Sequence, residues 1–237
     1  MHTSLRLRGW TLGRGFLALA LLLGGCAAGA RRARLQYLTP AQIEFAAFPP
    51  APALESETDK ADLKELLDWQ RKRTQAQCER ARSEAEANFR EFFGDGPFVK
   101  PLPPAAGEIL KRIRNDVQAA VSAVKNRYKR PRPFLHDAEL SPCLGRIGGY
   151  AYPSGHTAIS RVYARLLSEL SPASAEAFMA RADEIALDRV LGGVHHPSDI
   201  EAGKRLGDEL YAELRRRPSF QRDLETLRAS LASPQDR

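Results

Sequence analysis

Apolar residues recur at steps of three or four through most of this 237-residue chain, and this period limits what it can fold into. The longest stripes run over residues 60–93 and 106–130, and shorter ones over 155–170, 173–191 and 197–216. Gly and Pro residues separate these segments, as they do at helix ends. No stretch has the alternating pattern of a β-strand. We therefore expect an all-α, single-domain helical bundle.

The first 25 residues indicate an export signal. A basic start ends at Arg14, and the apolar stretch over 16–23 is too short to span a bilayer. It closes on Leu23-Gly24-Gly25-Cys26, which is similar to the lipobox of bacterial lipoproteins and implies cleavage before Cys26 and acylation of that cysteine. A plain secretory signal with an incidental cysteine is one alternative, and a retained membrane anchor is another. We expect an exported, periplasmic protein, anchored to the outer membrane by its N-terminal lipid.

Composition divides the rest of the chain into three parts. Residues 26–57 are interrupted by prolines and predict a flexible tether, and residues 58–216 hold the periodic segments of the domain. Residues 217–237 form a charged C-terminal tail, either a loosely docked helix or disordered. Export places Cys78 and Cys143 in an oxidising compartment, where they either form a disulfide or remain two small buried apolar residues. The sequence does not disclose the oligomeric state.

The charge of the chain favours anionic partners. Its formal net charge is +7, which attracts anionic substrates or surfaces. No basic run is interleaved with aromatic residues and no zinc-finger spacing is present, so we expect no nucleic-acid binding.

Ser154-Gly155-His156 lies where a loop enters a predicted helix. Amide groups at a helix start are unpaired and carry partial positive charge, so a phosphate can lie on the amides near Gly155 with Ser154 as a further donor. Gly155 lets the backbone approach the anion closely. The alternative is a serine cap followed by a core histidine.

His195 and Asp199 are four residues apart at the start of the last long helix. This spacing lets the carboxylate fix the tautomer of the ring and leaves the other nitrogen free as a base or nucleophile. A buried structural pair is one alternative. A metal site formed by His156, His195, His196 and Asp199 is another, but no cysteine joins it and nearby cations would repel a divalent ion, so we expect no metal and no cofactor.

Three basic residues stand close to these segments. Lys125 and Arg132 bracket a helix end, and Arg189 precedes His195 by six residues. Their neighbours Arg127, Lys129 and Arg130 are expected to be solvated surface charges.

Together the spacings Lys125-x6-Arg132-Pro133, Pro153-Ser154-Gly155-His156 and Arg189-x5-His195-x3-Asp199 resemble the type 2 phosphatidic acid phosphatase superfamily, and most closely its bacterial class A non-specific acid phosphatases. One departure is Asp188, which stands where the family has Ser and puts the hydrogen bonding around Arg189 in doubt.

The resemblance implies a metal-independent acid phosphatase that hydrolyses small phosphomonoesters. His195 would attack phosphorus to form a phosphohistidine, Asp199 would orient it, and His156 would protonate the leaving alcohol and then activate water. The oxygens of the phosphate would be held by a further set of residues: Lys125, Arg132, Ser154, Gly155 and Arg189.

The same motifs leave other functions open. One is a lipid phosphatase acting on phosphatidate, isoprenyl phosphate or lipid A. An anchor at Cys26 would hold the domain near such substrates, although the chain lacks the multiple membrane spans of the integral lipid phosphatases. A vanadate-dependent haloperoxidase uses the same cage, but this chain is short for one. A non-catalytic phosphate-binding lipoprotein would bind phosphate without turnover.

Overall fold

The computed structural model describes residues 2, 35–39 and 48–233, and residues 33–237 form one compact unit. The expected signal cleavage site and Cys26 lie outside the described residues. Within those residues, no helix combines the length and apolar character that a membrane crossing requires.

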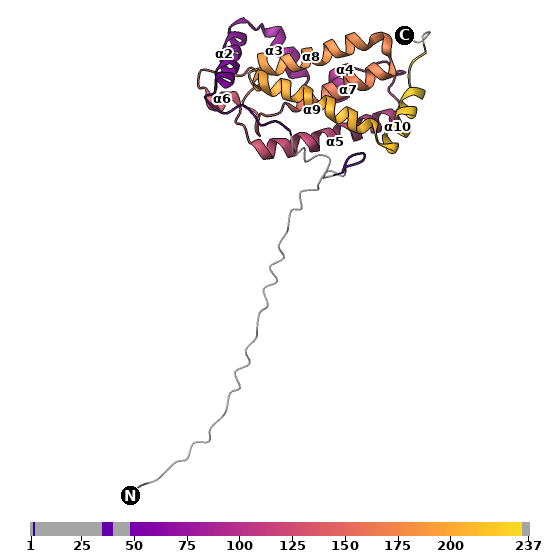
Figure 1. Ribbon diagram of the computed structural model, residues 1–237, viewed down its shortest axis with the longest axis horizontal. Helices are drawn as coiled ribbons and strands as arrows, with labels where there is room; N and C mark the ends of the chain where they lie inside the picture. The colour runs from indigo at the N-terminus through magenta and orange to yellow at the C-terminus, as the bar shows by residue number, and fades with distance from the viewer. Residues whose placement is uncertain (1, 3–34, 40–47, 234–237) are drawn as a thin grey trace. The chain divides into compact units, whose positions relative to one another are not determined.

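The fold is all-α, as predicted (Figure 1). In place of strands, the described part of the chain has one isolated bridge between Phe98 and Leu231. The helices are α2 (Glu57–Lys72), α3 (Gln75–Ser83), α4 (Phe89–Phe93), α5 (Pro104–Tyr128), α6 (Pro133–His136), α7 (Gly155–Leu170), α8 (Ala175–Leu191), α9 (Pro197–Arg215) and α10 (Pro218–Ala229), with a short 3-10 helix η1 (Pro172–Ser174) before α8.

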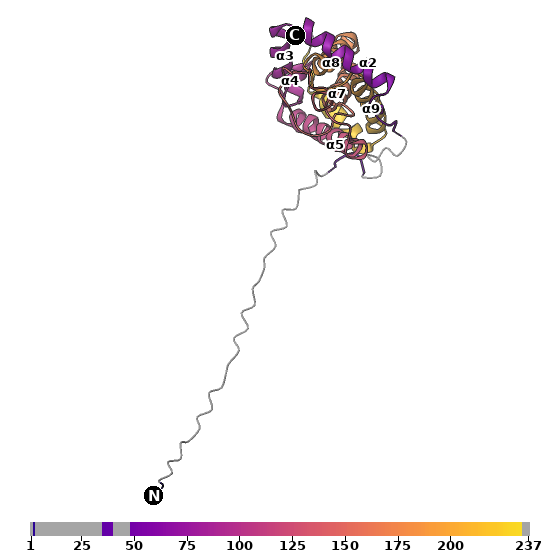
Figure 2. The same ribbon diagram turned by 90° about the vertical axis from the view of Figure 1, so that its left-hand side faces the viewer.

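Helix α7 lies at the centre of the bundle. It packs mainly against α8 and α9, and α5 lies along the lower side of the bundle in both views (Figures 1 and 2). Eleven of the sixteen residues of α7 are buried, so this helix is covered on most of its circumference. Its N-terminus is therefore held in place from several sides.

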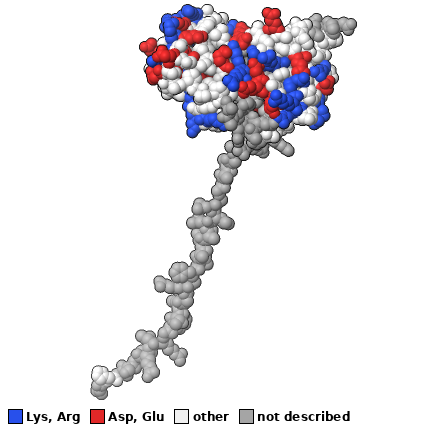
Figure 3. All heavy atoms as spheres, viewed as in Figure 1, with Lys and Arg blue, Asp and Glu red and all other residues white. Residues whose placement is uncertain are grey.

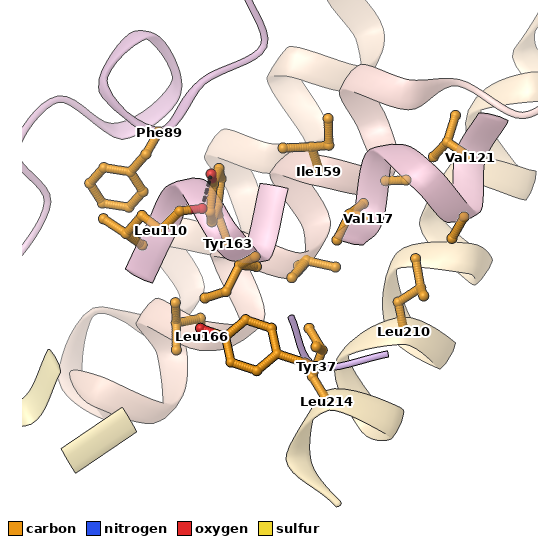
Figure 4. Packing of buried hydrophobic residues seen from close by; sticks show 14 of the residues in the cluster. Tyr37, Phe89, Leu110, Val117, Val121, Ile159, Tyr163, Leu166, Leu210 and Leu214 are labelled. Atoms are coloured by element: carbon orange, nitrogen blue, oxygen red, sulfur yellow. Dashed lines mark hydrogen bonds between the residues drawn. The ribbon is translucent and has the colours of Figure 1, made fainter. Parts of the chain in front are cut away.

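The main core joins α5, α7, α9 and α10 (Figure 4). Val117 and Val121 of α5 face Ile159 of α7, and the hydroxyl of Tyr163 donates to the Leu110 carbonyl oxygen at 2.9 Å. This bond satisfies the one polar atom of Tyr163 inside an apolar layer. A smaller cluster around Leu66 packs α2 against α8 and α9.

Two glycines allow α9 to approach α7 closely. A Cβ atom at Gly203 would lie 2.8 Å from the Ser154 carbonyl oxygen, and one at Gly207 would lie 2.7 Å from the Cβ of Arg161. At this close approach the Ser154 amide donates a hydrogen bond to the Asp199 carbonyl oxygen at 2.9 Å. The starts of the two helices that carry the second and third motifs are thereby joined.

The single helix expected over 60–93 is wrong, because the chain breaks twice. Thr74 caps α3 with a reciprocal Thr74–Gln77 capping box, and Asn88 caps α4 by accepting from the Glu91 amide. The capping side chains offer the backbone an alternative to continued helix. Between α3 and α4 the chain makes a turn over residues 84–88, in which Ala87 has φ +49°.

Two expected segment boundaries are also wrong. Tyr37, Leu38 and Phe48 fall within the expected tether but are buried in the main core. The tail forms α10, which places Phe220 and Leu224 in the same core. Apolar side chains on both sides of residues 58–216 therefore extend the domain beyond these bounds.

Cys78 and Cys143 form a disulfide, which settles the alternative left open by the sequence. It joins α3 to the long segment between α6 and α7. On the outside, the face shown in Figure 3 carries acidic and basic side chains interspersed with one another.

Candidate active site

A cleft of about 280 Å³ opens beside the N-terminus of α7 and is the place where the three motifs meet. Lys125 and Arg132 of the first motif, Gly155 and His156 of the second, and Arg189 and His195 of the third all line it. Residues separated by up to 70 positions in the chain thus share one hollow. Ser154 and Asp199 are fully buried and do not line the cleft.

Arg132 is held rigidly at the floor of the cleft. Its guanidinium donates to the carbonyl oxygens of Val194 at 2.9 Å, Gly149 at 3.2 Å and Gly148 at 3.2 Å. A further N–H lies 2.8 Å from Nε2 of His195. Burial lowers the pKa of Arg132 to about 10, and the side chain remains a cation at neutral pH.

The contact with Arg132 determines the tautomer of His195. A guanidinium has no acceptor, so Nε2 accepts and the ring proton lies on Nδ1, which is 3.4 Å from Oδ2 of Asp199. Burial, together with the charge of Arg132, holds the pKa of His195 well below its usual value. His195 is therefore neutral, with the lone pair of Nε2 at the cleft surface, as a nucleophile requires.

Asp199 is held by four donors. Its Oδ2 accepts from the amide of His196 at 2.8 Å, from Nδ1 of His196 at 2.9 Å and from His195, and its Oδ1 accepts from Arg130 at 2.8 Å. Burial by itself would raise the pKa of Asp199, but the hydrogen bonds from His195 and His196 outweigh burial and keep it well below the usual value. The carboxylate is thus ionised and fixed behind His195.

Arg130 was expected at the surface, and this expectation is wrong. Its side chain is 2% exposed and makes ion pairs with Asp59 at 2.7 Å, Asp62 at 3.0 Å and Asp199 at 2.8 Å. The alternation Arg130-Pro131-Arg132-Pro133 directs the two arginines to different partners, one behind Asp199 and the other into the cleft. Helix α2 is thereby connected to the carboxylate that orients His195.

Lys125 lies in the last turn of α5. Its ammonium donates to the carbonyl oxygens of Tyr150 and, at 3.1 Å, of Ala151. Burial and the neighbouring charge of Arg132 lower the pKa of Lys125 to about 7. An anion in the cleft would favour the charged form, because an opposite charge nearby raises the pKa of an amine.

The turn between α3 and α4 holds His156 on the other side of the cleft. Nε2 of His156 lies 3.0 Å from the Glu84 carbonyl oxygen, which can only accept, so Nε2 carries a proton. Burial, followed by the charge of Arg189, lowers the pKa of His156 to about 3. The ring is neutral in the free protein.

Arg189 is paired with a carboxylate that the sequence did not indicate. It donates to Oε2 of Glu84 at 2.8 Å and to the Ala81 carbonyl oxygen at 2.7 Å, while its buried Nε has no partner among the described residues. Burial raises the pKa of Glu84, partly offset by Arg189. Asp188, which replaces the family Ser, is instead bound to Arg80 by hydrogen bonds of 2.6 and 2.8 Å.

Ser154 caps α7, with its hydroxyl oxygen accepting from the amide of Thr157 at 3.4 Å and from the Thr157 hydroxyl at 2.9 Å. This is the cap considered as an alternative above, and the phosphate contact of its hydroxyl stays a prediction. Gly155 begins the helix and lines the cleft, so the amides of the first turn are close to any anion bound there.

Within the described ranges, no group of three or more His, Cys, Asp or Glu side chains is arranged to hold a metal ion. Sequence reasoning missed four residues of the site: Glu84, Arg130, and the cleft-lining pair Arg114 and Gln118. Arg114 and Gln118 follow the helical spacing back from Lys125 along α5, and this spacing was the available signal.

A family model described as the PAP2 superfamily matches residues 116–207, a range that contains every motif residue described above. Over these residues the chain resembles the PAP2 superfamily. The family resemblance inferred from the motif spacing is confirmed.

Two curated relatives are named non-specific acid phosphatases. The chain is 30% identical over 151 residues to a non-specific acid phosphatase of Providencia stuartii, covering 61% of this chain and 60% of that one. It is 36% identical over 118 residues to a non-specific acid phosphatase of Salmonella typhi, covering 47% and 46%. The chain thus spans about half of the length of the curated relatives it matches.

Two solved structures share the fold. One is the first bacterial vanadium-dependent iodoperoxidase, with a TM-score of 0.54 and 21% identity over 78% of this chain and 53% of that one. The other is a transmembrane PAP2-type phosphatidylglycerolphosphate phosphatase from Bacillus subtilis, with a TM-score of 0.50 and 17% identity over 68% and 87%. At these identities the likeness concerns the fold alone.

Proposed function

We propose that the protein is a metal-independent acid phosphatase that hydrolyses phosphomonoesters through a phosphohistidine. The observation that carries this proposal is the shared cleft, in which three cations and two neutral imidazoles surround one space. The names of the curated relatives support the same activity.

The cations would bind the phosphate and stabilise its transition state. Phosphoryl transfer depends mainly on positioning and on neutralising charge over the equatorial oxygens. Arg132, Arg189 and Lys125 are suited to this role, together with the amides at the start of α7. A phosphate oxygen bound by Arg132 would replace its contact with His195 and release the lone pair of Nε2.

His195 would then form the bond to phosphorus as the bond to the leaving oxygen breaks. Its Nδ1–H would stay directed at Asp199, whose charge stabilises the ring as it becomes cationic. His156 would give a proton to the leaving alcohol. In the second step His156 would take a proton from water, the water oxygen would bond to phosphorus, and the N–P bond would break. The bound dianion favours protonated His156, which is neutral in the free cleft.

Loss of His195 provides the direct test. Wild type, His195→Ala and the control His136→Ala, which removes a histidine bound to Glu55 instead, would be assayed with p-nitrophenyl phosphate in EDTA from acidic to neutral pH. We expect full activity in wild type and His136→Ala and none in His195→Ala. Rapid quenching should trap an acid-labile phosphoenzyme in wild type and His136→Ala and none in His195→Ala. Loss of wild-type activity in EDTA would contradict metal independence, and undiminished activity of His195→Ala would contradict the nucleophile.

We further propose that the protein is exported to the periplasm and held at the outer membrane by lipid at Cys26. The basic start, short apolar stretch and lipobox-like sequence before Cys26 support this. Metabolic labelling with a radioactive fatty acid should mark the wild-type protein and not Cys26→Ser. Equal labelling of both would overturn the anchor.

A further inference from the structure

The cleft continues along α5 away from the reacting histidines. Arg114, Gln118 and Lys125 all line it, and their spacing of four and seven residues places them within about 40° of one another around the helix. The Cα atoms of Arg114 and Lys125 are about 16 Å apart along the helix axis, from 1.5 Å per residue. The cleft is therefore longer than one phosphate group requires.

Arg114 closes the far end of this groove as a fixed cation. Its Nε donates to the Ala87 carbonyl oxygen at 2.8 Å and its Nη2 to the Glu86 carbonyl oxygen at 2.6 Å. Both acceptors belong to the same turn over residues 84–88 that holds His156. The two bonds orient the guanidinium and leave its other N–H groups without a partner among the described residues.

No carboxylate neutralises Arg114 within the described part of the chain, although its neighbour on α5, Arg112, pairs with Asp223 at 2.7 Å. Arg132 has the same pattern of backbone carbonyl partners without a carboxylate, and both line the cleft. The groove is lined by four cations and one acid, Glu86, whose exposed side chain is screened by solvent. An oriented, half-buried guanidinium without a counter-ion is suited to an external oxyanion.

We propose that Arg114 is a specificity-determining residue that binds a second oxyanion on the leaving group, so that the preferred substrates are elongated phosphomonoesters with a phosphate or carboxylate at the far end. This inference rests on the proposed phosphatase activity. Gln118 lies between the two ends, with its Nε2 donating to Ser122 Oγ at 3.3 Å, and lines the path of the connecting chain.

Matched substrates test the second anion. Straight-chain alkyl monophosphates would be compared with alkane bisphosphates and ω-carboxyalkyl phosphates of equal length. We expect kcat/KM of wild type to rise roughly 10- to 100-fold when the terminal anion is present, the range of a charge-assisted hydrogen bond, and to peak at one chain length. The effect should lie mainly in KM, because both the ground state and the transition state use the contact. A phosphate and a carboxylate of the same length distinguish which oxyanion the groove prefers.

Variants separate a binding role from a structural one. Arg114→Gln should bring the ratio of kcat/KM between the terminally charged substrate and the alkyl monophosphate down to about 1, and Arg114→Lys should restore part of this ratio. Lys111→Gln, which removes an exposed charge from the same helix, should leave the ratio at its wild-type value. Equal losses on both substrate series in Arg114→Gln would show that Arg114 only supports the turn and would overturn the proposal. An unchanged preference would overturn it as well. If wild type hydrolysed none of these phosphomonoesters, this result would instead contradict the proposed phosphatase activity.

Discussion

Arg132 donates a hydrogen bond to Nε2 of His195 across 2.8 Å, and this contact determines which nitrogen of His195 carries the proton. Since Nε2 accepts, Nδ1–H is directed toward Asp199. The cation that would bind phosphate therefore keeps His195, the proposed nucleophile, neutral and oriented until substrate replaces this contact. The sequence motifs predict phosphate binding for Arg132 and nucleophilic attack for His195 as separate roles, and this one hydrogen bond links the two residues.

Asp199→Asn should remove most of the activity without unfolding the protein. An amide can offer its NH2 to Nδ1 and so favour the wrong tautomer, as in hydrolases where a carboxylate orients a histidine. We expect kcat to fall by on the order of 10³–10⁴. Asp183→Asn, a half-exposed partner of Lys204, serves as the control and should retain wild-type kcat. A variant with near-normal kcat and a native circular dichroism spectrum would contradict the orienting role.

Arg130→Met should destabilise the protein strongly. The substitution leaves Asp59, Asp62 and Asp199 buried without their shared cation, and breaking a buried ion pair costs about 3–5 kcal/mol. Urea unfolding would measure the loss. Arg90→Met, at an exposed ion pair, should change stability by about 0.5 kcal/mol or less. Equal unfolding midpoints for the two variants would mean that the buried ion pairs of Arg130 do not stabilise the folded protein.

The positions of the motifs could be predicted from the sequence, but their partners could not. Helical spacing placed Lys125 at the end of α5 and Gly155 at the start of α7, because apolar period and capping residues act locally. No local pattern predicts the ion pairs of Glu84 and Arg130. Glu84 pairs with Arg189, 105 positions away, and Arg130 pairs with Asp199, 69 positions away, so both pairs depend on tertiary packing.

The break at residues 84–88 shows why one prediction failed. The apolar stripe continues through it, and no Gly or Pro marks it. Asn88 and Glu91 were readable as a cap, yet the reason for the turn is tertiary, because its carbonyl oxygens bind His156 and Arg114. Helical period alone does not reveal a turn that such contacts stabilise.

Binding of a dianion should weaken as pH rises through about 7. Lys125 has a pKa of about 7 in the free cleft, so above this pH a growing fraction of the protein must take up a proton before it binds the anion. Competitive inhibition by sulfate, which remains a dianion over this range, should weaken by up to about tenfold per pH unit. Lys125→Arg should remove this dependence because guanidinium stays charged. Identical profiles for the two proteins would contradict a titrating Lys125.

Acidification should destabilise the free protein through His156. Its pKa is about 3 in the folded state and about 6.5 in the unfolded chain, so the unfolded state binds more protons at any pH between these values. The stability present above pH 6.5 is therefore lost as pH falls toward 3, by roughly 2 kcal/mol at pH 5. Thermal unfolding should show a smaller drop from pH 7 to pH 5 in His156→Gln, and in wild type saturated with sulfate. Parallel curves would rule out His156 as the titrating group.

Loss of the disulfide should impair substrate binding as well as stability. Cys143 anchors the segment whose carbonyl oxygens at Gly148, Gly149 and Tyr150 hold Arg132 and Lys125, and residues 145–150 are otherwise exposed. A cross-link between residues 65 positions apart contributes up to about 4 kcal/mol by constraining the unfolded chain. The double variant Cys78→Ser/Cys143→Ser should therefore unfold at a lower temperature and show a raised KM for p-nitrophenyl phosphate. Dithiothreitol should bring wild type to the same values and leave the double variant unchanged. A lower unfolding temperature with an unaltered KM would mean that the segment holds Arg132 and Lys125 without its cross-link.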